Sequence, residues 1–164
     1  MRIVGCEILH CNAGWRDFSF LKLMTDENIT GISEYNECYG SPGLSGIIRR
    51  LVERIKDMDP LAHEHIHQCL YAATRQAPGG VNQQAIAAIE NALLDIKGQA
   101  LNIPVYDILG GAIRKEIPVY WSHCGTYLWR PEIAELCGVE AIRKAEDLIK
   151  LGKRVKDQGF LGLK

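Results

Sequence analysis

Residues 81–111, VNQQAIAAIENALLDIKGQALNIPVYDILGG, carry the most regular pattern in this chain of 164 residues. Apolar residues recur there at alternating steps of three and four, which is the period of one face of an α-helix. Gly98 lies inside this pattern and should cost about 1 kcal/mol relative to alanine, so it predicts a close packing contact. A short helical turn over residues 104–109 ends at a Gly-Gly pair. The stretch therefore predicts a helix over residues 81–101 whose buried stripe is Ile86, Ile89, Leu93, Ile96 and Ala100.

Upstream of this helix, three segments rich in β-branched and apolar residues predict short strands. The middle segment alternates, with Leu21, Leu23 and Thr25 on one face. Two loops differ in character: residues 11–17 are polar with one aromatic residue, and residues 35–44 are rich in glycine and proline. Because the strands follow one another closely, they predict an antiparallel meander made of residues 2–10, 18–25 and 29–34.

Two further helices are expected between the meander and residue 81. Residues 45–56 place apolar side chains on one stripe, with Ser45 as the N-cap. Asp59-Pro60 is a strong start signal for a helix that reaches about residue 74. Residues 1–115 are therefore expected to form an α+β domain, a three-stranded antiparallel meander packed on a helical bundle.

The pattern changes after residue 115. Residues 117–122, IPVYWS, form a nearly continuous apolar run, as expected of a strand buried on both faces of a parallel sheet. An amphipathic helix over residues 139–157 follows, and residues 160–164 begin another apolar strand. A strand, helix and strand at this spacing predict a βαβ unit. Residues 116–164 thus look like the first βα unit and second strand of a TIM-like (β/α) barrel, truncated at residue 164. Because a full barrel takes about 250 residues, we expect the gene to continue.

The amino-acid composition argues against several classes of protein. Hydrophobic residues make up 47%, charged residues 24%, and the net charge is −1, which gives no electrostatic case for nucleic acid or an anionic membrane as partner. No apolar run approaches the roughly 20 residues of a membrane helix, and no signal peptide precedes the first strand. The six cysteines are scattered without a CxxC pair, so neither a disulfide framework nor a zinc knuckle is expected. These features predict a cytoplasmic protein.

Three stretches of the sequence resemble one known family. They are TDENITGISE (residues 25–34), AIAAIENALLDIKGQALNIPVYDILGG (residues 85–111) and IPVYWS (residues 117–122). Their amino-acid sequences resemble those of the mandelate racemase/muconate lactonizing enzyme family of the enolase superfamily, and the resemblance covers the entire chain. It implies an N-terminal α+β capping domain followed by the start of the barrel.

The resemblance also implies a chemistry. Such enzymes use a divalent metal, usually Mg²⁺, to remove the proton α to a substrate carboxylate and to stabilise the enediolate. The family's three acidic metal ligands lie on the third, fourth and fifth barrel strands, so we expect them beyond residue 164 and assign no metal ligand here. The expected whole protein is a homo-oligomeric sugar-acid dehydratase. A racemase, epimerase or cycloisomerase remains an alternative, and so does a non-catalytic capping or oligomerisation module.

Lys164 is the candidate catalytic residue. The end of the chain, GFLGLK, resembles the family's second-strand motif, in which a lysine at this position contacts the substrate carboxylate. A second basic residue often follows two positions on, which is beyond the end of this chain. The alternative is a solvated lysine near a strand end.

Other candidates are substrate-binding residues. In the family, the loops after the first and third strands close over the barrel mouth and set specificity. Here these loops carry Trp15 and Arg16, then Asn36 and Tyr39; an arginine suits a carboxylate or polyol, and an aromatic ring excludes water when a lid closes. His123 follows the first predicted barrel strand, at the end where barrel active sites are built. The alternative for all of them is ordinary surface chemistry.

Polar residues at these positions favour a sugar acid as substrate. They are Asn12, Arg16, Asn36 and His123. The histidines at positions 63, 65 and 67 at first suggest a metal motif. However, only His63 and His67 would share a helix face, without a third ligand, so a polar helix surface is the better interpretation.

Overall fold

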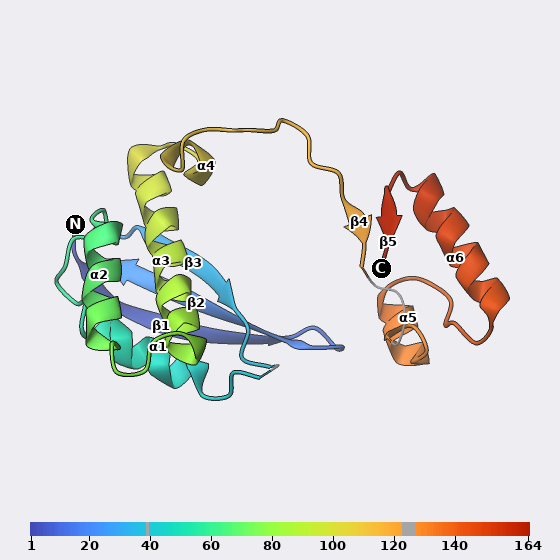
Figure 1. The fold of residues 1–164 in the computed structure, drawn as a ribbon, viewed down its shortest axis with the longest axis horizontal. Coiled ribbons are helices and arrows are strands. Elements are labelled where there is room, and N and C mark those ends of the chain that lie inside the picture. The colour runs from blue at the N-terminus through green and yellow to red at the C-terminus, as the bar shows by residue number, and fades with distance from the viewer. Residues whose placement is uncertain (39, 123–126) are drawn as a thin grey trace. The chain divides into compact units, whose positions relative to one another are not determined.

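The computed structural model describes residues 1–38, 40–122 and 127–164. The chain divides into two compact units, Met1–Ala112 and Ile113–Lys164, and each is described by itself (Figure 1). The domain boundary predicted between residues 115 and 116 falls next to this division.

The first unit contains a three-stranded antiparallel sheet in the order β1-β2-β3, which confirms the predicted meander. Its strands are β1 (Ile3–Asn12), β2 (Asp17–Thr25) and β3 (Thr30–Tyr35). The alternation of β2 is as expected, with Leu21, Leu23 and Thr25 buried on one face. The first loop is shorter than the sequence suggested, because β1 and β2 stay paired as far as Asn12 and Asp17.

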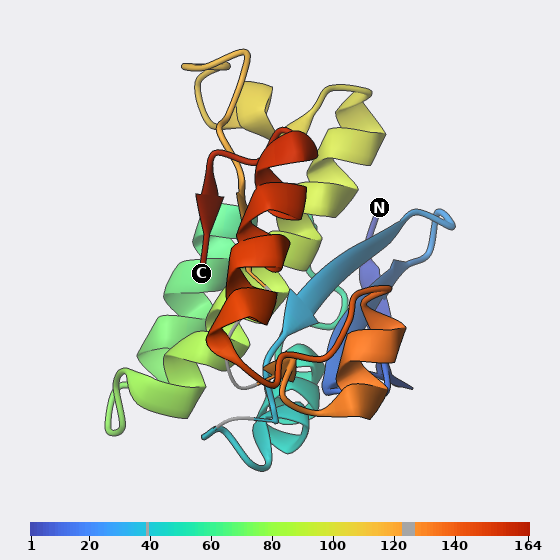
Figure 2. The same cartoon turned by 90° about the vertical axis from the view of Figure 1, so that its right-hand side faces the viewer.

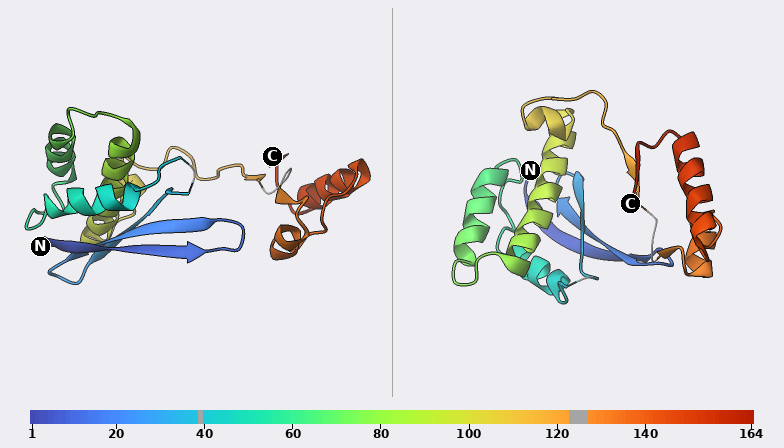
Figure 3. Two further views of the ribbon diagram at one scale, coloured as in Figure 1. Left: turned by 90° about the horizontal axis from the view of Figure 1, so that it is seen from below. Right: turned by 45° about the vertical axis from the view of Figure 1, so that its right-hand side comes forward.

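Three helices cover one face of this sheet: α1 (Leu44–Glu53), α2 (His63–Ala73) and α3 (Gly80–Leu101) (Figure 3). The predicted stripe of α3 is buried at Ile86, Ile89, Leu93 and Ile96, whereas Ala100 is exposed. A single hydrophobic core between sheet and helices therefore holds the first unit together. The short helix α4 (Val105–Ile108) follows α3.

Strand β3 and helix α3 approach each other unusually closely at Gly31. A Cβ atom placed on Gly31 would lie 2.0 Å from the carbonyl oxygen of Ala92, so only glycine fits. The same helix covers the outer edge of β3, where Asp95 accepts a hydrogen bond from the Ile32 N–H at 2.8 Å. The contact predicted at Gly98 is also present, because a Cβ atom placed there would lie 3.0 Å from the carbonyl oxygen of Ile103.

Two predicted helix starts are wrong. Gly43, not Ser45, occupies the N-cap position of α1, and no side chain of its own caps that helix. Helix α2 begins at His63 instead of directly after Pro60, because Asp59 accepts the Leu61 N–H and closes a separate turn first.

The second unit contains two parallel paired strands, β4 (Tyr120–Trp121) and β5 (Gly162–Leu163). Helix α6 (Ala145–Asp157) lies between them in the chain and runs beside β5 (Figure 2). This is the βαβ arrangement expected of a barrel start. Its small core consists of Leu128, Ala134, Ile142, Leu151 and Val155.

Details of the second unit differ from the prediction. A separate helix, α5 (Pro131–Leu136), precedes α6, and α6 starts only at Ala145 because Asp147 accepts the backbone N–H groups of Arg143 and Lys144. Residues 117–122 are not buried on both faces: Ile117 is 74% exposed. Within the described residues β4 has one neighbouring strand, so little covers this run. No helix in the described ranges is long and apolar enough to cross a membrane.

Candidate functional site

The tip of the β1–β2 hairpin is a compact polar turn. The amide of Asn12 donates to the Asp17 carboxylate at 2.6 Å, and its carbonyl oxygen accepts the Gly14 N–H at 2.8 Å. The Ala13 N–H closes the turn on the Arg16 carbonyl at 3.0 Å. Asn12 was one of the residues that favoured a sugar acid as substrate. Its side-chain nitrogen and oxygen both form hydrogen bonds within the turn.

Arg16 lies over aromatic rings next to this turn. Its guanidinium carbon is 3.8 Å from the centre of the Phe18 ring and 5.2 Å from that of Trp15, whose ring packs edge-on against Phe18. The guanidinium also forms an ion pair with Glu34 at 2.8 Å. Its buried Nε atom has no hydrogen-bond partner in the described structure. The guanidinium is therefore held in place by the two rings and Glu34, and its buried Nε–H still needs an acceptor.

The loop after β3 carries the second group of candidates. The side-chain oxygen of Asn36 accepts the Cys38 N–H at 3.1 Å, and the hydroxyl of Ser41 donates to Gln84 of α3 at 2.6 Å. Asn36 and Ser41 border a hollow of about 270 Å³ between this loop and α3, whose other polar lining includes Glu34, Gln84 and Asn91. Asn36 is exposed at this hollow.

The two candidate loops contact each other. The thiol of Cys38 donates to the Asp17 carbonyl at 3.1 Å, and the Arg16–Glu34 ion pair joins the hairpin tip to the end of β3. The structure thus brings Trp15 and Arg16 into one connected assembly with the loop of Asn36. Tyr39 belongs to the same loop but lies outside the described residues.

A buried network that the sequence did not suggest lies at the base of the second loop. The Ser45 hydroxyl donates to the Glu37 carboxylate, and the Ser45 N–H donates to its other oxygen at 3.2 Å. The Tyr35 hydroxyl lies 2.7 Å from the Ser45 oxygen. Burial alone would raise the pKa of Glu37, but the hydrogen bonds from Ser45 and Gly43 outweigh it and lower that pKa. Burial raises the pKa of Tyr35.

Lys164 lies in the second unit, at the end of its small parallel sheet. Its backbone N–H donates to the Trp121 carbonyl at 2.9 Å, so the ladder between the two strands continues to this residue. Trp121 packs against the core of α6, and Gly162 faces Tyr120 on the opposite side. By strand alternation Lys164 shares the face of Gly162, away from the helix. In a βα barrel that face lines the interior. His123 lies outside the described residues.

The structure offers no metal centre in the ranges it describes, since no three His, Cys, Asp or Glu side chains there could hold an ion. His67 instead pairs with Glu90 of α3 at 3.0 Å, and His63 lies 3.3 Å from the ammonium of Lys97. The described side chains therefore form no cluster that fits a Mg²⁺ ion. The five cysteines that are described are free thiols.

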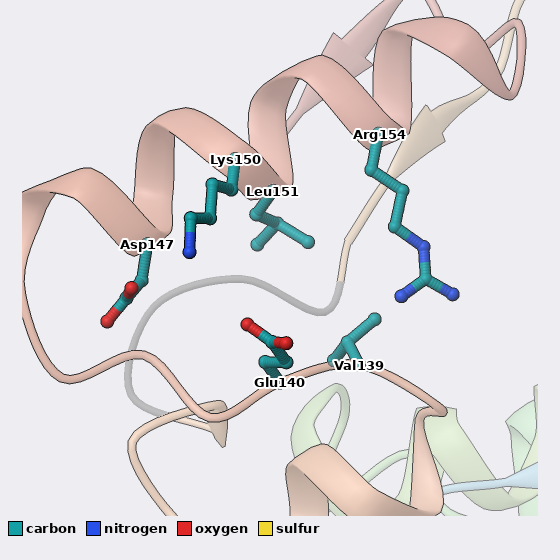
Figure 4. A pocket seen from close by; sticks show the side chains of 6 residues that line it. All are labelled: Val139, Glu140, Asp147, Lys150, Leu151 and Arg154. Carbon is teal, nitrogen blue, oxygen red and sulfur yellow. The ribbon is translucent and has the colours of Figure 1, made fainter.

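A separate hollow of about 270 Å³ lies in the second unit between α6 and the segment before it (Figure 4). Lys150 and Arg154 reach into it from α6, and Glu140 faces them from the preceding segment. None of the candidate residues lines this hollow, and its charges are mixed, so we assign no ligand to it.

Comparison with known proteins places these observations in a family. Residues 11–110 match the model of the mandelate racemase/muconate lactonizing enzyme N-terminal domain. A D-galactonate dehydratase of Xanthomonas axonopodis pv. citri is 35% identical over 127 residues, which cover 73% of this chain and 31% of that protein. The chain thus spans about a third of the length of this relative.

Solved structures of other proteins also resemble this chain. A candidate L-alanine-DL-glutamate epimerase from Burkholderia xenovorans strain LB400, bound to magnesium and fumarate, is 48% identical with a TM-score of 0.74, covering 77% of this chain and 31% of that one. The 3,6-anhydro-D-galactonate cycloisomerase of Zobellia galactanivorans is 26% identical with a TM-score of 0.79, covering 99% and 42%. With its meander, its helical layer and its βαβ start, this chain belongs to the mandelate racemase/muconate lactonizing enzyme family of the enolase superfamily.

Proposed function

We propose that this chain is the N-terminal part of a Mg²⁺-dependent sugar-acid dehydratase. The similarity to a D-galactonate dehydratase over 127 residues is the observation that carries this proposal. The loops of Arg16 and Asn36, with their polar and aromatic side chains, support a polyhydroxylated carboxylate as substrate. We place the metal ligands in the part of the barrel that follows residue 164.

The reaction would remove the α-proton from C2 of the acid and expel the hydroxyl of C3 as water, after protonation by an acid group. The resulting enol tautomerises to a 2-keto-3-deoxy acid. Within this chain, Lys164 would hold the substrate carboxylate, where its fixed positive charge stabilises the negative charge that develops on that group. Trp15, Arg16, Asn36, Tyr39 and His123 would bind the polyol end and exclude water.

A racemase or epimerase is the second candidate, because the Burkholderia relative at 48% identity bears the name of a candidate epimerase. It would return the α-proton to the opposite face of the same carbon without losing water. A cycloisomerase, as in the Zobellia relative, would close a ring instead. All three share the first proton transfer.

One experiment separates a dehydratase, an epimerase and a non-catalytic module from one another. The full-length protein, with Mg²⁺, is incubated in D₂O with D-galactonate and a panel of related acids, and products are followed by NMR. A dehydratase gives a keto acid. An epimerase gives deuterium at C2 with inverted configuration and no loss of water. Absence of both turnover and α-proton exchange across the panel would favour the non-catalytic module.

We also propose a cytoplasmic homo-oligomer. The free cysteines are consistent with a reducing compartment.

The oligomer is supported by apolar side chains on the outer face of the sheet. Leu9 and Ile32 are about half exposed there, at 47% and 57%. Light scattering on the full-length protein tests the oligomer.

A further inference from the structure

Helix α1 lacks an N-terminal cap of its own. Its N-cap residue is Gly43, in the left-handed region at φ 84°, and its first turn contains no acidic residue. The first N–H groups of a helix need acceptors from elsewhere, and the positive end of the helix dipole favours a negative one. Glu37, from the loop before the helix, supplies that acceptor to the Ser45 N–H.

The hydroxyl groups around Glu37 form a chain with one direction. A carboxylate can only accept hydrogen bonds, so the Ser45 hydroxyl donates its one proton to Glu37. The Tyr35 hydroxyl must therefore be the donor in its hydrogen bond with the Ser45 oxygen. Ser45 and Tyr35 are both 7% exposed. Removing the carboxylate would leave buried donors without an acceptor, which proteins tolerate poorly.

Glu37 lies between the two candidate residues of its loop, Asn36 and Tyr39. Its side chain is partly buried, whereas Asn36 and Cys38 on either side are exposed. Holding Glu37 against α1 therefore leaves both neighbours exposed, with Asn36 at the hollow that it borders and Cys38 at the Asp17 carbonyl. Ser41 ties the far end of the loop to Gln84, and Cys38 ties its middle to the hairpin tip.

We propose that Glu37 is a positioning residue, which caps helix α1 from the preceding loop and thereby fixes Asn36, Cys38 and residues 40–43 in the arrangement that receives substrate. The second half of this statement rests on the proposed function. Glu37 itself touches no substrate and acts through Asn36 and its neighbours.

The test uses the full-length protein and two readouts. One is hydrogen exchange of the amides of residues 43–46, and the other is kcat and KM with the best sugar acid. Glu37→Ala should speed exchange of the Ser45 amide about fivefold, the effect typical of losing a helix cap. It should raise KM about tenfold, with kcat changing less, because the loop must be ordered at the moment of binding.

Three further variants keep the test decisive. Glu37→Gln should give intermediate values, since its amide oxygen still accepts from Ser45 without the charge. Ser45→Ala, which keeps the N–H contact, should shift both readouts in the same direction but less, and it serves if Glu37→Ala does not fold. Glu53→Ala, on the same helix in an exposed pair with Lys56, is the matched control and should change neither.

Failure of this inference is distinguishable from failure of the proposed function. If the native protein turns over no sugar acid, the proposed function fails, and the exchange readout alone decides whether Glu37 caps the start of α1. If the native protein is active while Glu37→Ala keeps both its KM and its slow exchange, the positioning role is overturned. Equal effects from Glu53→Ala would overturn it as well.

Discussion

Two cations of this chain occupy contrasting surroundings. Arg16 is three-quarters covered, lies over the Phe18 ring and pairs with Glu34. Lys164 is exposed at a strand end, where only its backbone takes part in the sheet ladder. A charge held in advance binds an anion without a further ordering cost, whereas a free one must be ordered on binding. Their substitution should therefore have different consequences.

Lys164 should matter for turnover and little for folding. In the full-length enzyme, Lys164→Ala is expected to lower kcat by about 10²–10³, the effect usual when one donor to a developing negative charge is removed. Its free energy of unfolding should stay within about ±0.5 kcal/mol of the native value. Lys164→Arg should restore activity only in part, because the guanidinium is larger and planar. Steady-state kinetics and thermal unfolding are measured on one preparation.

The control for this experiment is Lys153→Ala, an exposed lysine on α6 that should leave kcat unchanged. Near-normal turnover of Lys164→Ala would identify Lys164 as a solvated surface lysine.

Arg16 should affect substrate affinity. Arg16→Gln is expected to raise KM for a sugar acid about tenfold, because it removes a cation that is already oriented beside the candidate loops. Lys22→Gln is a matched control: Lys22 lies in β2 of the same hairpin and pairs with Glu7 at 2.9 Å, with similar exposure. Lys22→Gln should cost under about 1 kcal/mol of stability, because exposed pairs contribute little. Arg16→Gln should cost more, because the covered guanidinium also packs on the Phe18 ring. An equal KM change in both variants would argue against a substrate contact of Arg16.

At the scale of elements, helix α3 organises the first unit. One face of α3 fills the core, and its side chains Asp95 and Gln99 also bond the backbone of β3 at Ile32 and Thr30. The outer edge of β3 is thereby covered, which removes a template for aggregation. This close docking depends on Gly31, where the helix backbone occupies the space of a side chain.

Gly31→Ala should destabilise the first unit by at least about 1–3 kcal/mol, because its Cβ would overlap the Ala92 carbonyl and force β3 away from α3. Gly46→Ala is the control with the opposite sign. Gly46 lies in α1 with open space around it, so alanine there should stabilise by about 0.5–1 kcal/mol. Chemical denaturation measures both, and a neutral Gly31→Ala would show that the strand and helix separate without loss.

At the scale of the whole molecule, the described residues lack the metal site that the proposed function requires. The described residues gather no three ligands for an ion, while the Burkholderia relative binds magnesium. Mg²⁺ needs several oxygen ligands in a near-octahedral arrangement, which scattered surface carboxylates do not provide.

The 164-residue chain alone should therefore bind Mg²⁺ only weakly and catalyse no turnover, whereas the full-length protein should bind it and be active. Titration calorimetry on both forms is the measurement, with circular dichroism to verify that the shorter form is folded. A micromolar site on the 164-residue chain would contradict this expectation.

Local pattern was enough to predict most of the fold. The alternation of Leu21, Leu23 and Thr25 and the stripe from Ile86 to Ile96 reflect the strand and helix periods, and both are buried as expected. The meander and the βαβ start follow from the order and spacing of such segments. Helix ends were less predictable, since Ser45 resembles an N-cap in sequence yet lies inside the helix.

The candidate site, like the fold, could be predicted from the sequence only in part. The sequence by itself determined which family the chain resembles, which loops carry polar and aromatic residues, and that a second strand begins after residue 159. Only the tertiary structure decided that Glu37 caps α1, that Arg16 pairs with Glu34, and that Cys38 reaches Asp17. The physical reason is that periodicity records which side chains leave water along one element. Hydrogen bonds between loops depend on where separate elements come to lie, and no local pattern encodes that.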